Sequence, residues 1–221
     1  MKIHTIPVGP FQANCIIFFD EKTKQGVVVD PGDEPKKIIE QIRKDKLSIT
    51  HILLTHAHID HIMGLKQVQE ACQAEVWLHK HDEPLFVNSC AQAQALGVKW
   101  KDNLPTVNHY LEDQNVLTCG SLNIRVIHTP GHSAGSVCFF VEDWSDPTER
   151  SDLKVLLTGD TLFAGSVGRT DLWGGKAYQL KASLKKLTVF PSDTRVIPGH
   201  GPETTIGQEK EENPYFSEQL N

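Results

Sequence analysis

Four potential metal ligands lie close together in the segment Thr-His-Ala-His-Ile-Asp-His at residues 55–61. In an extended segment, residues i and i+2 project to the same side, so His56 and His58 can reach one metal ion together. Asp60 and His61 then remain for a second ion at the bend that follows. The spacing favours two adjacent metals over the alternative, in which these are solvated loop histidines and Asp60 caps the next helix.

Three further candidate ligands stand in one kind of local setting. His132, Asp160 and His200 each come soon after a predicted strand and directly after a glycine. Strand ends held by tight turns are rigid and lie on one rim of a sheet, so they can gather ligands from distant parts of the sequence. The repeated pattern of strand, small turn and ligand therefore predicts one site.

Hydrophobic periodicity predicts the elements that must position these residues. Short apolar runs predict strands at residues 14–19, 26–30, 49–54, 75–78, 121–127, 136–141, 154–157 and 195–197. Apolar residues at helical spacing predict helices over residues 34–46, 62–72 and 177–187, with a shorter helix after Asp82. The weak periodicity of residues 88–118 predicts a long surface excursion. The hydrophilic residues 142–152 predict an exposed hairpin loop.

Two strand-rich halves that each carry helices predict an α+β protein, with an αββα sandwich of two mixed β-sheets flanked by helices. In such a fold, loops from both halves meet at one rim. The chain has 221 residues, of which 39% are hydrophobic and 23% charged. This length and composition predict a single globular domain over residues 1–221.

Composition also excludes several classes of partner. The 22 Lys and Arg against 28 Asp and Glu give a net charge of -6, which offers no source for phosphate attraction, so no nucleic-acid partner is expected. No apolar run approaches the roughly 20 residues of a membrane span, and the N-terminal segment lacks a secretory signal. The five cysteines are odd in number and form no Cys-x-x-Cys pair, which argues against disulfides and a thiolate zinc site and predicts a cytoplasmic location.

With these motifs in view, the chain resembles the metallo-β-lactamase superfamily and, within it, the short bacterial type of the glyoxalase II (hydroxyacylglutathione hydrolase) branch. The motifs that carry the resemblance span nearly the whole chain: Val29 to Gly32, Thr55 to His61, Thr129 to Ser133, Thr158 to Phe163, Gly168 to Asp171 and Pro198 to Pro202. The resemblance implies the αββα fold. It also implies that the first metal is held by His56, His58 and His132, the second by Asp60, His61 and His200, and that Asp160 bridges both. Asp60 and Asp160 are the predicted catalytic residues.

All seven predicted ligands are nitrogen or oxygen donors, which suit zinc but also iron or manganese. We expect two divalent ions, with zinc favoured. Two such ions sharing a hydroxide lower the pKa of water toward about 7, which supplies a nucleophile at neutral pH. The departing thiol of a thioester, with a pKa near 8.5, leaves as a thiolate without a dedicated acid. The predicted reaction is hydrolysis of a small acyl thioester, with S-lactoylglutathione, an intermediate of methylglyoxal detoxification, as the favoured substrate.

Several departures and alternatives bear on this function. No cysteine occupies a motif position, so antibiotic hydrolysis is not expected, and the C-terminal helical domain that helps long glyoxalase II enzymes bind glutathione is not expected either. Arg169 lies where those enzymes carry a basic residue that meets glutathione, but it can equally form a salt link to Asp171 that holds its loop.

The alternative function is that of an iron-dependent persulfide dioxygenase of this fold, which uses only His56, His132 and Asp160. The protein is expected to be a monomer or a small homo-oligomer.

Overall fold

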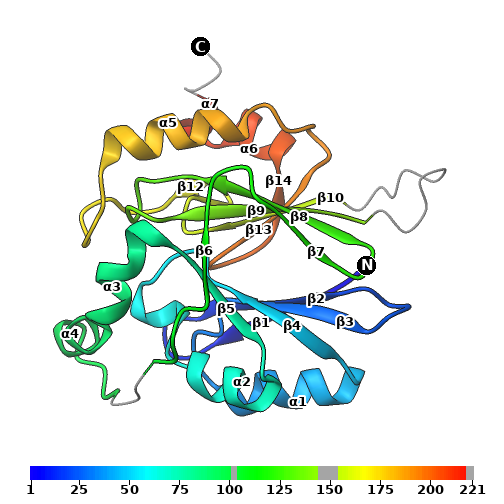
Figure 1. The fold of residues 1–221 in the computed structure, drawn as a ribbon. Helices are drawn as coiled ribbons and strands as arrows, with labels where there is room; N and C mark the ends of the chain where they lie inside the picture. Colours follow the sequence, from blue (N-terminus) through cyan, green and yellow to red (C-terminus); the bar gives the residue numbers. More distant parts are fainter. Residues whose placement is uncertain (101–103, 144–153, 218–221) are drawn as a thin grey trace. The chain divides into compact units, whose positions relative to one another are not determined.

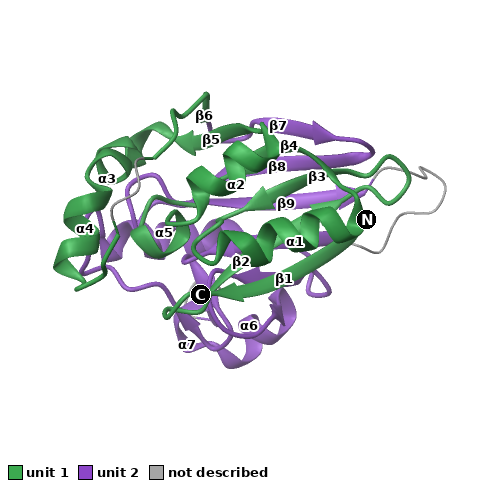
Figure 2. Ribbon diagram, turned by 90° about the horizontal axis from the view of Figure 1, so that it is seen from below, with its two compact units in different colours: residues 1–111 green, residues 112–221 purple. Residues whose placement is uncertain are grey.

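Two six-stranded β-sheets form the framework of the structure, a computed structural model that describes residues 1–100, 104–143 and 154–217 (Figure 1). The chain divides into two compact units, residues 1–111 and residues 112–221, and each contains one of these sheets (Figure 2). Among the described residues, no helix has the length and apolar character needed to cross a membrane.

Unit 1 contains a mixed sheet with strand order β1-β2-β3-β4-β5-β6. Its strands are β1 (Lys2–Val8), β2 (Ala13–Phe19), β3 (Gln25–Val29), β4 (Ser48–Leu53), β5 (Glu75–His79) and β6 (His109–Leu111). Its helices are α1 (Pro35–Asp45), α2 (Leu65–Cys72), α3 (Glu83–Val87) and α4 (Ser89–Ala95), with short 3-10 turns η1 (Ile59–His61) and η2 (Lys80–Asp82). The first three strands pair antiparallel, whereas β3 to β6 are parallel and are joined by helical crossovers.

Helices α1 and α2 cover one face of this sheet (Figure 1). The apolar residues of α1 recur three to four positions apart, so Ile38 and Ile42 share one buried side of the helix. They pack in a single core with Leu65 and Val68 of α2 and with alternate residues of the strands. This packing fixes the carboxyl ends of β3 and β4, from which the predicted motif loops emerge.

Unit 2 contains the second mixed sheet, with strand order β14-β13-β10-β9-β8-β7. Its strands are β7 (Val116–Cys119), β8 (Leu122–His128), β9 (Val137–Asp143), β10 (Lys154–Gly159), β13 (Arg195–Pro198) and β14 (Thr204–Thr205). A small hairpin follows β10 and consists of β11 (Leu162–Phe163) and β12 (Ser166–Val167); the helices are α5 (Ala177–Leu187), α6 (Ile206–Glu212) and α7 (Pro214–Ser217). Leu180, Leu184 and Leu187 of α5 lie on the buried side of that helix, in one core with Phe140 and Leu156 of the sheet.

The predicted fold class is confirmed, because both sheets are mixed and helices flank them. The prediction of a long surface excursion over residues 88–118 is wrong, since α4, β6 and β7 form there. The Ala/Gln-rich stretch gives no strong apolar period, yet Gln92 and Ala93 are buried. Strand β1 and helices α6 and α7 were not predicted, and most of the predicted hairpin loop at residues 142–152 lies outside the described residues.

Candidate metal centre

The His-x-His segment of unit 1 lies just after β4, where the chain leaves the sheet and enters the η1 turn. Its three histidines are buried, with exposed fractions of 1% for His56, 5% for His58 and 0% for His61. The rings of His56 and His58 lie 4.8 Å apart between centroids, and those of His56 and His61 lie 4.2 Å apart. Burying imidazoles is costly unless their polar atoms are engaged, so three of them packed together indicate a built site rather than solvated loop residues.

A buried network around Asp30 fixes the orientation of two of these histidines. The Asp30 carboxylate accepts hydrogen bonds from the Thr55 amide (2.7 Å) and the Thr55 hydroxyl (2.6 Å), and its Oδ2 lies 3.0 Å from Nδ1 of His61. Because the Thr55 hydroxyl gives its hydrogen to Asp30, its oxygen is left to accept one from Nδ1 of His56, 3.0 Å away. Both imidazoles then carry a proton on Nδ1, which leaves Nε2 as the ligand atom.

Asp30 reaches this position through an unusual backbone conformation. Its φ angle of 48° lies in the left-handed region, which aspartate tolerates better than most residues because its short side chain hydrogen-bonds locally. Gly32, two residues on, approaches the η1 turn so closely that an added Cβ would collide with the carbonyl oxygen of Asp60. The Asp-Pro-Gly motif therefore packs directly against the backbone of the η1 turn, which carries Asp60 and His61.

The spacing of side-chain atoms in unit 1 fits a metal ion. Two donors that share a tetrahedral ion at about 2.1 Å lie roughly 3.4 Å apart. Nε2 of His61 and Oδ2 of Asp60 are separated by 3.7 Å, close to that value and too long for a hydrogen bond. A second group of potential ligand atoms lies within 4.8 Å of one another and comes from Asp30, His56 and His61. The Asp30 oxygens, however, already form contacts with Thr55 and His61. Asp30 is thus better placed to orient ligands than to be one.

Unit 2 brings together His132, Asp160 and His200. Oδ2 of Asp160 lies 3.5 Å from Nε2 of His132 and 3.7 Å from Nε2 of His200. Nδ1 of His132 is 2.8 Å from the carbonyl oxygen of Arg169, which can only accept a hydrogen bond, so this histidine also presents Nε2 as its ligand atom. One carboxylate oxygen placed between two such nitrogens has the arrangement expected of a ligand that touches two ions.

A second buried network, absent from the sequence predictions, holds the hairpin beside Asp160. Glu209 of α6 is 1% exposed and accepts hydrogen bonds from the Gly165 amide (2.9 Å), the Thr204 hydroxyl (2.6 Å) and the Asn213 amide (2.7 Å). Asn213 also donates to the Ser166 carbonyl. In the sequence, Glu209 stands in a run of charged residues that resembles a solvated helix face, so only its tertiary contacts identify it.

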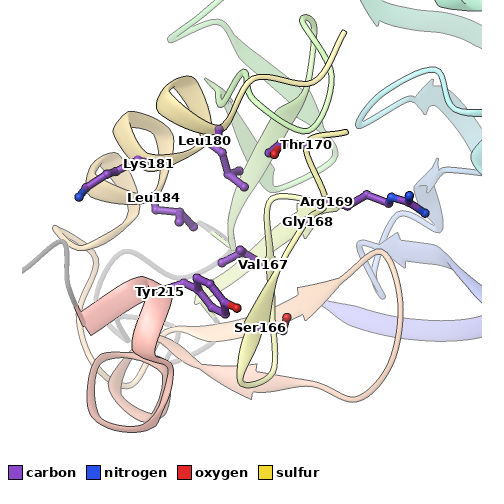
Figure 3. A pocket seen from close by; sticks show the side chains of 10 residues that line it. Ser166, Val167, Gly168, Arg169, Thr170, Leu180, Lys181, Leu184 and Tyr215 are labelled. Carbon is purple, nitrogen blue, oxygen red and sulfur yellow. The ribbon is translucent and has the colours of Figure 1, made fainter. Parts of the chain in front are cut away.

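Arg169 forms a bidentate ion pair with Asp171, with distances of 2.7 Å from Nε to Oδ1 and from Nη2 to Oδ2. The salt link considered for this pair is therefore present, and it lowers the pKa of Asp171 to about 2. The Arg169 backbone contributes to the wall of a cavity of about 360 Å³ between α5, β12 and α7, lined by Val167, Leu180 and Tyr215 among others. Figure 3 shows the Arg169 side chain pointing away from this cavity. The Arg169 guanidinium is mostly exposed, so the carboxylate of another molecule has access to it and can take the place of Asp171 as its partner.

The chemistry of the cysteines agrees with a site built from nitrogen and oxygen donors. Burial raises the pKa of the Cys138 thiol to about 11 and holds that of Cys15 well above its usual value. Both thiols therefore stay protonated at neutral pH and pack in the core. Neither offers the thiolate that a sulfur-ligated zinc site needs.

Comparison with known proteins gives these motifs a family. The sequence profile described as the Metallo-beta-lactamase superfamily matches residues 8–200, a range that includes all seven predicted ligands. The chain belongs to the metallo-β-lactamase superfamily. The resemblance predicted from the motifs is thereby confirmed at the level of the superfamily.

Two curated relatives of this metallo-β-lactamase superfamily member carry hydrolase names. It is 35% identical over 225 residues to a Haemophilus influenzae protein named hydroxyacylglutathione hydrolase GloC, covering 98% of this chain and 99% of the relative. It is 36% identical over 218 residues to a Bacillus subtilis protein named probable metallo-hydrolase YqgX, covering 98% of each. The chain is accordingly a metallo-hydrolase of this superfamily.

Solved structures of the superfamily share the fold over nearly the full chain. The BLEG-1 B3 metallo-β-lactamase aligns with a TM-score of 0.82 and 35% identity, covering 98% of this chain and all of that one. TTHA1623 in a di-iron-bound form aligns with a TM-score of 0.82 and 38% identity, covering 96% and 99%. ETHE1 from Myxococcus xanthus aligns with a TM-score of 0.77 and 25% identity, covering 100% and 91%. The di-iron form demonstrates that a relative of this fold accepts iron.

Proposed function

We propose that this chain hydrolyses a small acyl thioester, with S-lactoylglutathione as the favoured substrate. The observation that carries the proposal is the placement of the Asp160 carboxylate between Nε2 of His132 and Nε2 of His200 in unit 2. The name of the Haemophilus influenzae relative supports the substrate class. A single domain over residues 1–221, a cytoplasmic location and a monomer or small homo-oligomer belong to the same proposal.

The ligand assignment that we propose follows the family resemblance. His56, His58 and His132 would hold one divalent ion, Asp60, His61 and His200 a second, and Asp160 both. All are nitrogen or oxygen donors, so zinc is favoured and iron or manganese fits as well. The joining of residues from the two units in one centre rests on the resemblance alone. The donor spacing within each unit independently supports the assignment of those residues as ligands.

The protein's own groups would prepare this centre for hydrolysis. When bound, divalent ions of this kind supply a hydroxide nucleophile from water at neutral pH. The Asp30 and Thr55 network keeps Nδ1 of His56 and His61 protonated, and the Arg169 carbonyl does the same for His132. Asp60 and Asp160 would act as the catalytic carboxylates by holding the ions at the reacting atoms. Since a thiolate leaves readily, no additional general acid is required.

Oxidation of a persulfide with a single iron is the second candidate. It would use His56, His132 and Asp160, and the di-iron form of TTHA1623 supports iron as an occupant. The presence of Asp60, His61 and His200 in metal-compatible positions favours hydrolysis, since these residues would have no ligand role in a mononuclear site.

Parallel assays of the purified chain distinguish the candidates. Metal content is measured first, and S-lactoylglutathione, glutathione persulfide and a β-lactam are then offered under identical conditions. We expect about two metals per chain and thioester turnover that exceeds both oxygen uptake and β-lactam cleavage. The β-lactam is included because a relative of 35% identity is named a B3 metallo-β-lactamase. Dominant oxygen uptake with one iron per chain would refute the hydrolase proposal.

Arg169→Ala is predicted to raise the KM for S-lactoylglutathione several-fold more than it lowers kcat. The guanidinium would bind a substrate carboxylate equally in the ground and transition states, and loss of such uniform binding appears in KM. Asp171→Asn is the matched control, because it removes the partner of the ion pair and leaves the Arg169 guanidinium in place. If both variants change KM equally, Arg169 acts only by holding its loop.

A further inference from the structure

Gln92 of α4 contacts the backbone of the segment that carries His56 and His58. Its side chain is buried, with an exposed fraction of 3%. Oε1 accepts a hydrogen bond from the Ile59 amide (3.2 Å), and Nε2 donates to the carbonyl oxygen of Ala57 (3.0 Å). Nε2 also donates to the Leu85 carbonyl (2.8 Å), which ties α4 to α3. Both ends of the side-chain amide therefore form hydrogen bonds. Two of these three bonds, to Ala57 and Ile59, join Gln92 to the segment that carries the histidines.

Asp82, at the end of η2, completes this support by contacting the other backbone group of the same residue, Ala57. It is fully buried, and its Oδ2 accepts a hydrogen bond from the Ala57 amide at 3.0 Å. Ala57 stands between the two histidines, so its N–H is held by Asp82 and its carbonyl by Gln92. In a segment without a strand ladder or helix, such side-chain contacts satisfy backbone groups that would otherwise be buried without partners.

These contacts fix the direction in which the two histidines project. His56 and His58 flank Ala57, so rotation of either Ala57 peptide group would swing one imidazole away from the other. The Asp30 network acts on the ring of His56 through Thr55. The contacts of Gln92 and Asp82 act on the backbone between the two rings. A metal site with preset geometry requires that both the orientation of the ligand ring, here His56, and the backbone that carries it are fixed.

We propose that Gln92, together with Asp82, is a positioning residue that presets the His56-Ala57-His58 segment for metal binding. The proposal rests on the metal-binding role of these histidines in the proposed function, but it is independent of the substrate. Gln92 lies 34 residues after His58 and 36 after His56 in the sequence, within a stretch that carries no motif. Its side-chain hydrogen bonds go to the backbone of Ala57, Ile59 and Leu85, so it acts through the backbone.

The test compares Gln92→Met with the parent and with Asn88→Ala. Methionine keeps the volume and removes both hydrogen-bonding ends. Asn88 is the matched control because it lies at the N-terminus of α4 and its side chain donates to the Pro84 carbonyl, a backbone group outside the histidine segment. Zinc affinity is measured by competition with a chromogenic chelator, cobalt-loaded protein is examined by visible absorption, and amide exchange of residues 55–61 is followed in the metal-free protein.

We expect Gln92→Met to weaken zinc binding by about 10- to 100-fold, the usual effect of removing a group that orients ligands. The cobalt spectrum should change, and exchange of the 55–61 segment should accelerate without metal. Asn88→Ala should change none of these, even if it lowers Tm to a similar extent. Gln92→Glu keeps the acceptor for the Ile59 amide and loses the donor to Ala57, so its zinc affinity should lie between those of the parent and Gln92→Met. If Gln92→Met does not fold, Gln92→Glu serves as the test variant.

The proposal is overturned if a folded Gln92 variant binds zinc within twofold of the parent and leaves the exchange of residues 55–61 unchanged. That result would leave Gln92 a residue that only joins α3 and α4. These readouts do not use a thioester, so the failure of the proposed function would look different. In that case the parent would bind metal, respond to Gln92→Met as described and yet hydrolyse no thioester.

Discussion

Asp160→Ala is expected to strip both metals from the protein, whereas His200→Ala should empty only one site. In unit 2 the Asp160 carboxylate lies within 3.7 Å of the ligand nitrogens of both His132 and His200, so it is the side chain placed to touch two ions. Its removal also takes away a negative charge that offsets the repulsion between two dications in a partly buried site. A loss of this kind should exceed the roughly 100-fold upper range seen when only an orienting partner is removed.

Chelator titration of each variant, with metal content and thioester turnover followed together, measures this difference. Asp160→Asn is the matched control, because it keeps the shape of the side chain and removes only its charge. We expect Asp160→Asn to bind metal more weakly than the parent but more tightly than Asp160→Ala. An Asp160→Ala protein that holds two metals tightly and retains near-parental activity would exclude the bridging role.

The proposed ligands could be selected from the sequence because their chemistry is local. The His-x-His-x-Asp-His segment concentrates donor atoms at a spacing that few other functions need, and each remaining ligand follows a strand and a glycine. The strands and amphipathic helices that position them have strong periods, and this is why α1, α5 and the central strands were predicted at nearly their observed bounds. Hydrophobic period and motif spacing are both properties of short segments.

The supporting residues could not be predicted in the same way, because their roles depend on contacts between distant segments. Gln92 stands in an Ala/Gln-rich stretch without apolar period, and Glu209 stands in a charged run, so both resemble surface residues in the sequence. Each is nevertheless buried: Gln92 satisfies the Ile59 amide next to the histidine segment, and Glu209 satisfies the Gly165 amide of the hairpin that follows Asp160. Helix α4 was missed for the same reason, since the polar side chain that it buries is satisfied only by the tertiary fold.

Gly168→Ala is predicted to weaken metal binding by more than about 10-fold although it alters none of the proposed ligands. An added Cβ at this position would collide with the carbonyl oxygen of Asp160 and would lie 3.2 Å from Nδ1 of His132. Relief of the collision must move the 168–169 segment away, and this segment supplies the Arg169 carbonyl that accepts the hydrogen bond from His132. One methyl group would therefore disturb the backbone of Asp160, the proposed bridging ligand, and the ring orientation of His132 together.

Gly165→Ala provides the matched control for this prediction. Gly165 lies in the turn of the neighbouring hairpin with a φ of 70° and no atom within 4 Å of an added Cβ. Alanine there costs about 1 kcal/mol for the left-handed backbone, but it creates no collision. Gly165→Ala should lower Tm slightly and keep parental metal affinity, whereas Gly168→Ala should lose metal affinity by more than about 10-fold, a range typical of disturbed orienting contacts. Equal metal affinities in the two folded variants would mean that the 168–169 segment is free to shift without moving Asp160 or His132, and the close approach at Gly168 would then have no part in shaping the site.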